Sequence, residues 1–129
     1  MSTTSHIRSF IAAEAITAYA VVSMDSAGKI VITDAATDNK VVGVAQRSCA
    51  SGDSVEVLVY GITRAIASEA LDETKCILSA DTDGKLQPCE SGDTNFYPIA
   101  RLIPNVNQID VAADEQCFVY FFGPSSLNA

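Results

Sequence analysis

The stretch of the chain whose spacing comes closest to a metal site is residues 79–90. Oxygen-bearing side chains stand at alternate positions from Ser79 to Asp83, a glycine follows, and Glu90 closes the segment. A calcium loop uses this alternation with a sharp-turn glycine and a closing glutamate. Here the first position is serine, Pro88 lies inside the closing segment, and the flanks are typical of strands. We therefore interpret the segment as a hairpin turn and expect no metal or other cofactor.

Side chains suited to acid–base or nucleophilic catalysis are present but scattered. The acidic pairs Asp72-Glu73 and Asp114-Glu115 lie in turn-like stretches, whereas catalytic carboxylates need settings that drive their pKa values apart. A serine triad needs a histidine base, and the one histidine, His6, lies near the N-terminus. No Gly-x-Ser-x-Gly elbow and no phosphate-binding glycine loop occurs. We therefore expect that the protein is not an enzyme.

The four cysteines show no pattern of paired metal ligands. They stand at positions 49, 76, 89 and 117, and no two form Cys-x-x-Cys. Structural zinc needs about four converging nitrogen or sulfur ligands, usually with paired spacing. We expect four reduced, mostly buried thiols that pack as small hydrophobic groups.

Length and charge restrict the class of protein. A chain of 129 residues predicts one domain, and 48% hydrophobic residues provide a core. The 16 acidic against 8 basic residues give a net charge of −8, the wrong sign for binding nucleic-acid phosphates or an anionic membrane surface. No apolar run approaches the roughly 20 residues of a membrane-spanning helix, and the N-terminus lacks a signal-peptide pattern. We expect synthesis and folding in a cytoplasm.

The element that organises the chain is a predicted β-hairpin over residues 41–61. Two β-branched runs flank a turn of small residues at 50–53, and glycines at 43 and 61 indicate bulges or close backbone approaches. Further short β-rich runs recur with turn signals between them, which predicts a single-domain, all-β barrel or sandwich. The other expected strands are 17–24, 29–33, 62–67, 75–80, 85–87, 96–102 and 115–122.

Two of these strands have special features. The strand at 96–102 is interrupted by Pro98, which lacks a ladder donor, so we place it at a sheet edge. The last strand shows no inside–outside alternation, so both of its faces should be covered. It is either a central core strand or a strand covered by a second copy. The candidate self-association residues are Phe118, Tyr120, Phe121 and Phe122.

The chain also contains an internal duplication. Glu-Ala-Ile at 14–16 matches Glu-Ala-Leu at 69–71, and Gly-Lys-Ile at 28–30 matches Gly-Lys-Leu at 84–86. The apolar run that ends at Gly61 matches the run that ends at Gly123. The matches keep their order, which predicts two similar halves that share one core.

Residues 1–13 are interpreted as an N-terminal arm before a β domain at 14–124 and a tail at 125–129. Ile7, Phe10 and Ile11 would suit one face of a short helix or an extended segment. Exposed together, such side chains are unfavourable unless something covers them. Either a partner covers the arm, or the arm folds back onto its own barrel.

Five motifs together resemble a known family. They are Ala-Ile-Thr-Ala-Tyr-Ala-Val-Val-Ser at 15–23, Gly-Lys-Ile-Val at 28–31, Val-Val-Gly-Val-Ala at 41–45, Ala-Ser-Gly-Asp-Ser-Val-Glu-Val at 50–57 and Tyr-Gly at 60–61. In this order they resemble the small capsid decoration, or cement, proteins of tailed bacteriophages. The resemblance covers residues 14–67 most clearly and 69–123 more weakly.

The resemblance implies a tulip-like all-β fold, attachment to the major capsid protein on the outer surface of the virion, stabilisation of the head, no catalysis, and a homotrimer. The arm has no matching family motif, and we infer the capsid contacts Ile7, Arg8, Phe10 and Ile11 from their position. The alternative function is a glycan- or receptor-binding β module of a phage tail or a cell surface. Such a module would favour exposed aromatic side chains over a shallow groove.

Overall fold

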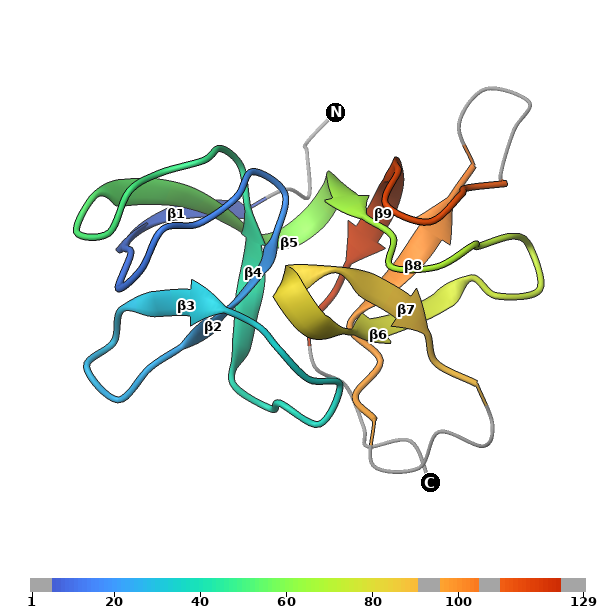
Figure 1. The fold of residues 1–129 in the computed structure, drawn as a ribbon, viewed down its shortest axis with the longest axis horizontal. Helices are drawn as coiled ribbons and strands as arrows, with labels where there is room; N and C mark the ends of the chain where they lie inside the picture. The colour runs from blue at the N-terminus through green and yellow to red at the C-terminus, as the bar shows by residue number, and fades with distance from the viewer. Residues whose placement is uncertain (1–5, 91–95, 105–109, 124–129) are drawn as a thin grey trace.

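The computed structural model describes residues 6–90, 96–104 and 110–123. These residues form nine strands and one 3-10 turn, so the predicted all-β class is confirmed (Figure 1). The elements are β1 (His6–Ile11), β2 (Val21–Met24), β3 (Ile30–Ile32), β4 (Val41–Ala45), β5 (Ser54–Ile66), β6 (Ile77–Ala80), η1 (Thr82–Gly84), β7 (Leu86–Pro88), β8 (Ala100–Ile103) and β9 (Gln116–Phe121).

All paired strands are antiparallel and belong to one continuous sheet. Its order is β3-β2-β4-β5-β9-β8-β6-β7, and β1 pairs with β5 beside this path. β5 is the longest described strand, at 13 residues, and its two parts pair with different sets of strands. Its first part pairs with β1 and β4, and its second part pairs with β9. The hairpin predicted at 41–61 is therefore confirmed as β4 and the first part of β5.

The sheet curls into two lobes, which lie left and right in Figure 1. The first lobe comprises β1 to β4 and the part of β5 before Gly61, and the second lobe comprises the rest of β5 and β6 to β9. In each lobe the curled sheet closes through one parallel bridge. Ala12 bridges Ile30 in the first lobe, and Ala67 bridges Leu86 in the second.

The register confirms that the two lobes repeat one plan. Val22 opposite Ile32 on β2 and β3 corresponds to Leu78 opposite Pro88 on β6 and β7. By the same comparison of registers, β8 is the second-lobe equivalent of β4, and β9 is the equivalent of the first part of β5. The second part of β5 is the equivalent of β1. The duplicated motifs are thus the local signature of a repeated set of strand pairings.

Each lobe has a hydrophobic core, and the second core extends into the first lobe. The first core is built from Ala12, Ile16, Ala20, Val22, Ile30, Ala45, Val55 and Val57. The second contains Leu71, Leu78, Leu86, Ile99, Leu102, Val119 and Phe121, together with Val21, Val41, Val44 and Leu58 of the first lobe. The strands β2 and β4 and the part of β5 around Leu58 therefore lie between the two cores and are covered on both faces. This accounts for their nearly continuous apolar sequences.

Two strand predictions were wrong. Residues 62–67 do not form a separate strand, because the chain continues through Gly61 as β5. Gly61 has a φ of 127°, a backbone conformation that glycine adopts without steric cost. The strand expected at 96–102 is not at an edge, because β8 lies between β9 and β6. β8 begins at Ala100, so Pro98 lies before the ladder and removes none of its hydrogen bonds.

The described part of the expected arm is a strand. β1 runs antiparallel to β5 from His6 to Ile11, with a register irregularity between His6 and Ile7. Of the two arrangements left open by the sequence, the structure has residues 6–11 folded back along the domain. Residues 1–5 and the expected tail at 125–129 lie outside the described residues.

Candidate interaction surface

The segment with calcium-loop spacing is a hairpin turn, as expected. The 3-10 turn η1 joins β6 to β7, the Asp81 carboxylate accepts the Thr82 amide hydrogen bond at 2.7 Å, and Asp83 has a φ of 59°. Ser79 is fully buried on β6 and points into the protein interior. Within the described ranges, no three His, Cys, Asp or Glu side chains are grouped to hold a metal ion.

The acidic pairs occupy turns, and the carboxylates of Asp72, Asp114 and Glu115 make local hydrogen bonds. Asp72 accepts hydrogen bonds from the Thr74 amide at 2.9 Å and its hydroxyl at 2.6 Å, and these bonds lower the pKa of Asp72. Asp114 lies 2.7 Å from the Lys85 ammonium group, and this hydrogen bond raises the pKa of Lys85. The His6 ring contacts the Tyr60 ring instead, with the two ring planes tilted by 56°.

The last strand alternates, contrary to the sequence-based expectation. Cys117, Val119 and Phe121 face the core, whereas Phe118 and Tyr120 are half-buried on the opposite face. The sequence could not show this, because both faces of β9 carry large apolar or aromatic side chains. Of the candidate self-association residues, Phe121 is fully buried in the second core. The other three are Phe118, Tyr120 and Phe122, which are half-buried.

An aromatic row crosses the junction between the lobes. Its members are His6, Tyr60, Tyr120 and Phe122. Successive ring centroids lie 5.9, 5.5 and 6.2 Å apart, and the Tyr60–Tyr120 contact is edge-to-face. The Tyr120 hydroxyl donates a hydrogen bond to that of Tyr60, which raises the pKa of Tyr120. Beside the row, the Arg64 guanidinium lies 5.3 Å from the centre of the Phe118 ring.

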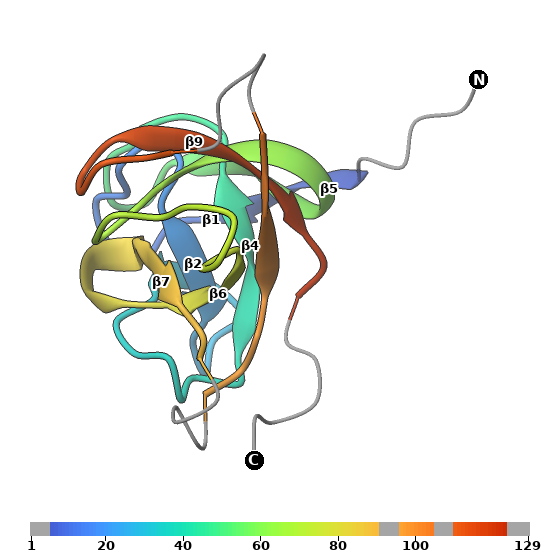
Figure 2. The ribbon, with the colours of Figure 1, turned by 90° about the vertical axis from the view of Figure 1, so that its right-hand side faces the viewer.

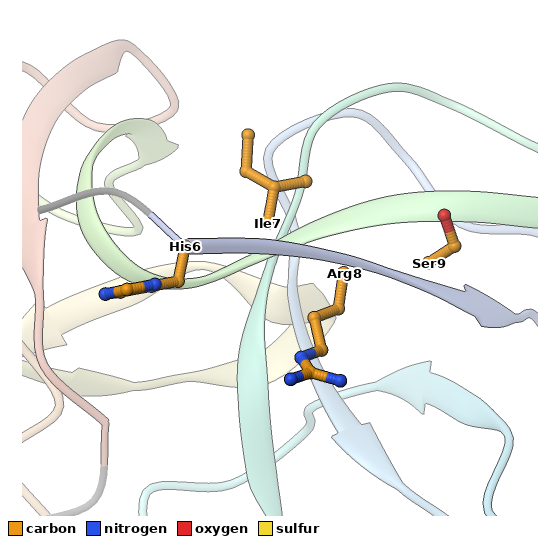
Figure 3. A pocket seen from close by; sticks show the side chains of 4 residues that line it. All are labelled: His6, Ile7, Arg8 and Ser9. Atoms are coloured by element: carbon orange, nitrogen blue, oxygen red, sulfur yellow. The ribbon is translucent and has the colours of Figure 1, made fainter. Parts of the chain in front are cut away.

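The candidate capsid contacts on β1 divide between its two faces. Ile7 and Ile11 are 55% and 43% exposed, whereas Phe10 packs against the first core. Figure 3 shows Ile7 and Arg8 on opposite sides of β1, beside an open hollow lined by His6, Ile7, Arg8 and Ser9. β1 therefore combines a side chain that holds it to the domain with apolar side chains that remain accessible.

Several accessible apolar side chains were not singled out from the sequence. Besides Ile7 and Ile11, the large exposed hydrophobic residues in the described ranges are Met24, Tyr60, Ile62 and Ile77. Each lies in a segment that was predicted to be extended, but whether its outer face is covered depends on where the other lobe packs. For Ile62, the signal in the sequence was that residues 62, 64 and 66 share one face of an extended strand, and Arg64 on that face is charged.

The comparisons with known proteins point to one fold. The chain matches no model of a known protein family and no curated protein. Among the residues that the structure describes, no helix is long and apolar enough to span a bilayer. The structure is similar to the crystal structure of the head fiber gp8.5 N base of bacteriophage phi29. The TM-score is 0.64, the sequence identity is 15%, and the match covers 95% of this chain and 99% of that chain. Over 95% of its length, the chain thus shares the fold of a phage head-fibre base.

Proposed function

We propose that this chain is a structural protein of a tailed-phage head. In this proposal it binds the outer surface of the shell formed by the major capsid protein, stabilises the shell, and performs no catalytic step. The observation that carries the proposal is the shared fold, which extends over 95% of this chain and 99% of the phage head-fibre base. The sequence resemblance to capsid decoration proteins supports it independently, because that resemblance depends on motifs and not on topology.

The physical mechanism would be linkage between binding and shell stability. A protein that binds the assembled shell, but not its dissociated subunits, stabilises the assembly by mass action. Contacts that are individually weak add up when several copies are held on one lattice. A homotrimer, as the family resemblance implies, would attach through three sites at once.

The attachment surface that we propose is the accessible part of β1. Ile7 and Ile11 carry exposed apolar surface, and Arg8 can meet an acidic group of the shell. Phe10 would act indirectly, because it holds β1 against the first core. Burying one isoleucine contributes about 1.5–3 kcal/mol, which corresponds to a change in Kd of roughly tenfold to a hundredfold.

The experiment measures attachment of purified variants to phage heads that lack this protein. We expect Ile7→Asp to raise the Kd for heads at least about tenfold while leaving the melting temperature unchanged. The matched control is Ile62→Asp, because Ile62 occupies the equivalent position in the second lobe and is 56% exposed, against 55% for Ile7. Wild-type protein that does not bind heads would overturn the proposed function. Equal weakening by both variants would overturn the role of β1.

A second candidate function is favoured by the aromatic row. Tyr60 and Tyr120 form an edge-to-face pair at the surface, and accessible aromatic rings can pack against the apolar faces of sugars. In this alternative the chain is a glycan- or receptor-binding β module. The alternative would be excluded by two results together. Tyr60→Ala protein would still bind empty heads while Ile7→Asp protein would not, and the wild type would bind nothing on a glycan array.

A further inference from the structure

The sheet register places an equivalent row of side chains on the outer face of each lobe. Residues that pair directly across neighbouring strands point to the same face. The first-lobe row is Val21, Val44, Leu58 and Ile7. The second-lobe row, in the same order, is Ile77, Arg101, Tyr120 and Ile62. The two rows occupy the same positions in the repeated plan, so their surroundings can be compared residue by residue.

The second lobe covers most of the first-lobe row. Val21 and Val44 are fully buried, Leu58 nearly so, and all three belong to the second lobe's core. Only Ile7, at the end of the row, remains exposed. The cover includes the β6–β7 turn, because a Cβ placed on Gly84 would lie 2.8 Å from the Ala20 Cβ. The Gly84 amide also donates a hydrogen bond to the Thr33 carbonyl at 2.8 Å.

The second-lobe row has no such cover within the described chain. Ile77 is 40% exposed where its equivalent Val21 is 0% exposed. Arg101 is exposed and Tyr120 is half-buried, where Val44 and Leu58 are buried. The second lobe is turned toward the viewer in Figure 2, with the first lobe behind it.

The covering surface of the second lobe also has an uncovered equivalent in the first lobe. Ala80, beside the β6–β7 turn, is 2% exposed, whereas its equivalent Met24 is 46% exposed. Gly84 is in close contact with β2, whereas a Cβ on its equivalent Gly28 would meet no atom within 4 Å. The chain therefore carries one complete lobe-to-lobe contact and the two unmatched halves of a second one.

We infer that a second copy of this chain completes this contact head to tail. The row from Ile77 to Tyr120 of one copy packs against the β2–β3 turn of the next, as the row from Val21 to Leu58 packs against the β6–β7 turn within the chain. The occupant is a copy of this protein because the chain itself provides both surfaces and already shows how they fit. The inference deepens the self-association in the proposed function by naming the surfaces that meet.

The internal contact specifies the neighbours across the interface. Gly28 of one copy should approach Cys76 and Ile77 of the next, because Gly84 approaches Ala20 and Val21 within the chain. Arg101 replaces Val44 in the row, and Asp25, which follows Met24, supplies an opposite charge on the facing lobe. The contact is heterologous, so it either closes into a ring or continues as a filament. A ring of three would be the trimer that the resemblance implies.

The test combines two variants that each disable one half of the contact. Ile77→Asp blocks the row, and Met24→Asp blocks the turn that receives it. Sedimentation equilibrium should show that wild type self-associates, and that each variant raises the dissociation constant about tenfold or more. An equimolar mixture of the two should form a dimer, because each contributes the half that the other lacks. Ile62→Asp is the control, since its equivalent Ile7 stays uncovered in the internal contact.

A cross-linking measurement tests the geometry independently. Gly28→Cys should form an intermolecular disulfide with Cys76 under mild oxidation, and adding Cys76→Ser should abolish it. Three results would overturn the inference: a wild type that stays monomeric, a mixture that does not dimerise, or Met24→Asp protein that self-associates like wild type. The last result would indicate a face-to-face contact through Ile77. Binding to heads by protein that stays monomeric would overturn this inference and leave the proposed function intact.

Discussion

The contact between the two lobes can be tested with a matched pair of glycine substitutions. Gly84 and Gly28 occupy equivalent turns and have positive φ angles of 72° and 80°. Alanine at either position carries the same local cost, because an L residue is strained in this region, by about 1–2 kcal/mol. Part of this cost is offset because alanine also restricts the unfolded chain, by about 0.4–1 kcal/mol.

The two sites differ only in what surrounds the added methyl group. At Gly84 it would lie 2.8 Å from the Ala20 Cβ and 2.9 Å from the Val21 carbonyl oxygen, and at Gly28 it would meet nothing within 4 Å. Backbone atoms cannot rotate away, so β2 and the β6–β7 turn must separate. Overpacking of this kind costs roughly 1–3 kcal/mol. We expect Gly84→Ala to destabilise the protein by that much more than Gly28→Ala.

Thermal unfolding measures this difference. For a chain of 129 residues, 1 kcal/mol corresponds to about 4 °C in Tm. We expect Gly28→Ala to lower Tm by about 4 °C and Gly84→Ala by about 8–16 °C. The scans are run at a concentration where both proteins are monomeric, because Gly28 lies in the proposed contact between copies. If both substitutions lower Tm equally, the close packing of the lobes at Gly84 contributes nothing to stability.

Two further predictions concern β9. Phe121→Ala should destabilise the protein by about 3–5 kcal/mol, because Phe121 is fully buried. Phe118→Ala should destabilise it much less, because Phe118 is half-buried on the outer face. Equal losses of stability in chemical denaturation would contradict the observed alternation. Burial raises the pKa of the Cys117 thiol to about 11, so at pH 8 only about one thiol in a thousand is ionised. Mass spectrometry after labelling with a thiol reagent should find Cys117 modified more slowly than half-buried Cys49, and comparable rates in the folded protein would show that β9 opens readily.

Much of the architecture could be predicted because its signals are local. Turn residues at 50–53 and 81–84 mark hairpins whose chemistry depends on a few neighbouring positions. The duplicated motifs around 14, 28 and 57 revealed two related halves, because each half repeats the same turns and closing bridge. The candidate surface could be predicted only in part. Ile7 and Ile11 are accessible, whereas Phe121 belongs to the core.

The sequence by itself determined the all-β class, the main hairpins and the duplication, because short-range turn and strand preferences encode them. Only the tertiary structure decided that β5 continues through Gly61, that β8 is an interior strand, and which outer face is covered. Val21 and Ile77 illustrate the physical reason. They are similar side chains at equivalent positions, but one is buried and the other exposed, because the second lobe packs on the first and nothing in the described chain packs on the second. Burial is a property of the whole assembly, and no short-range pattern in the sequence distinguishes the two residues.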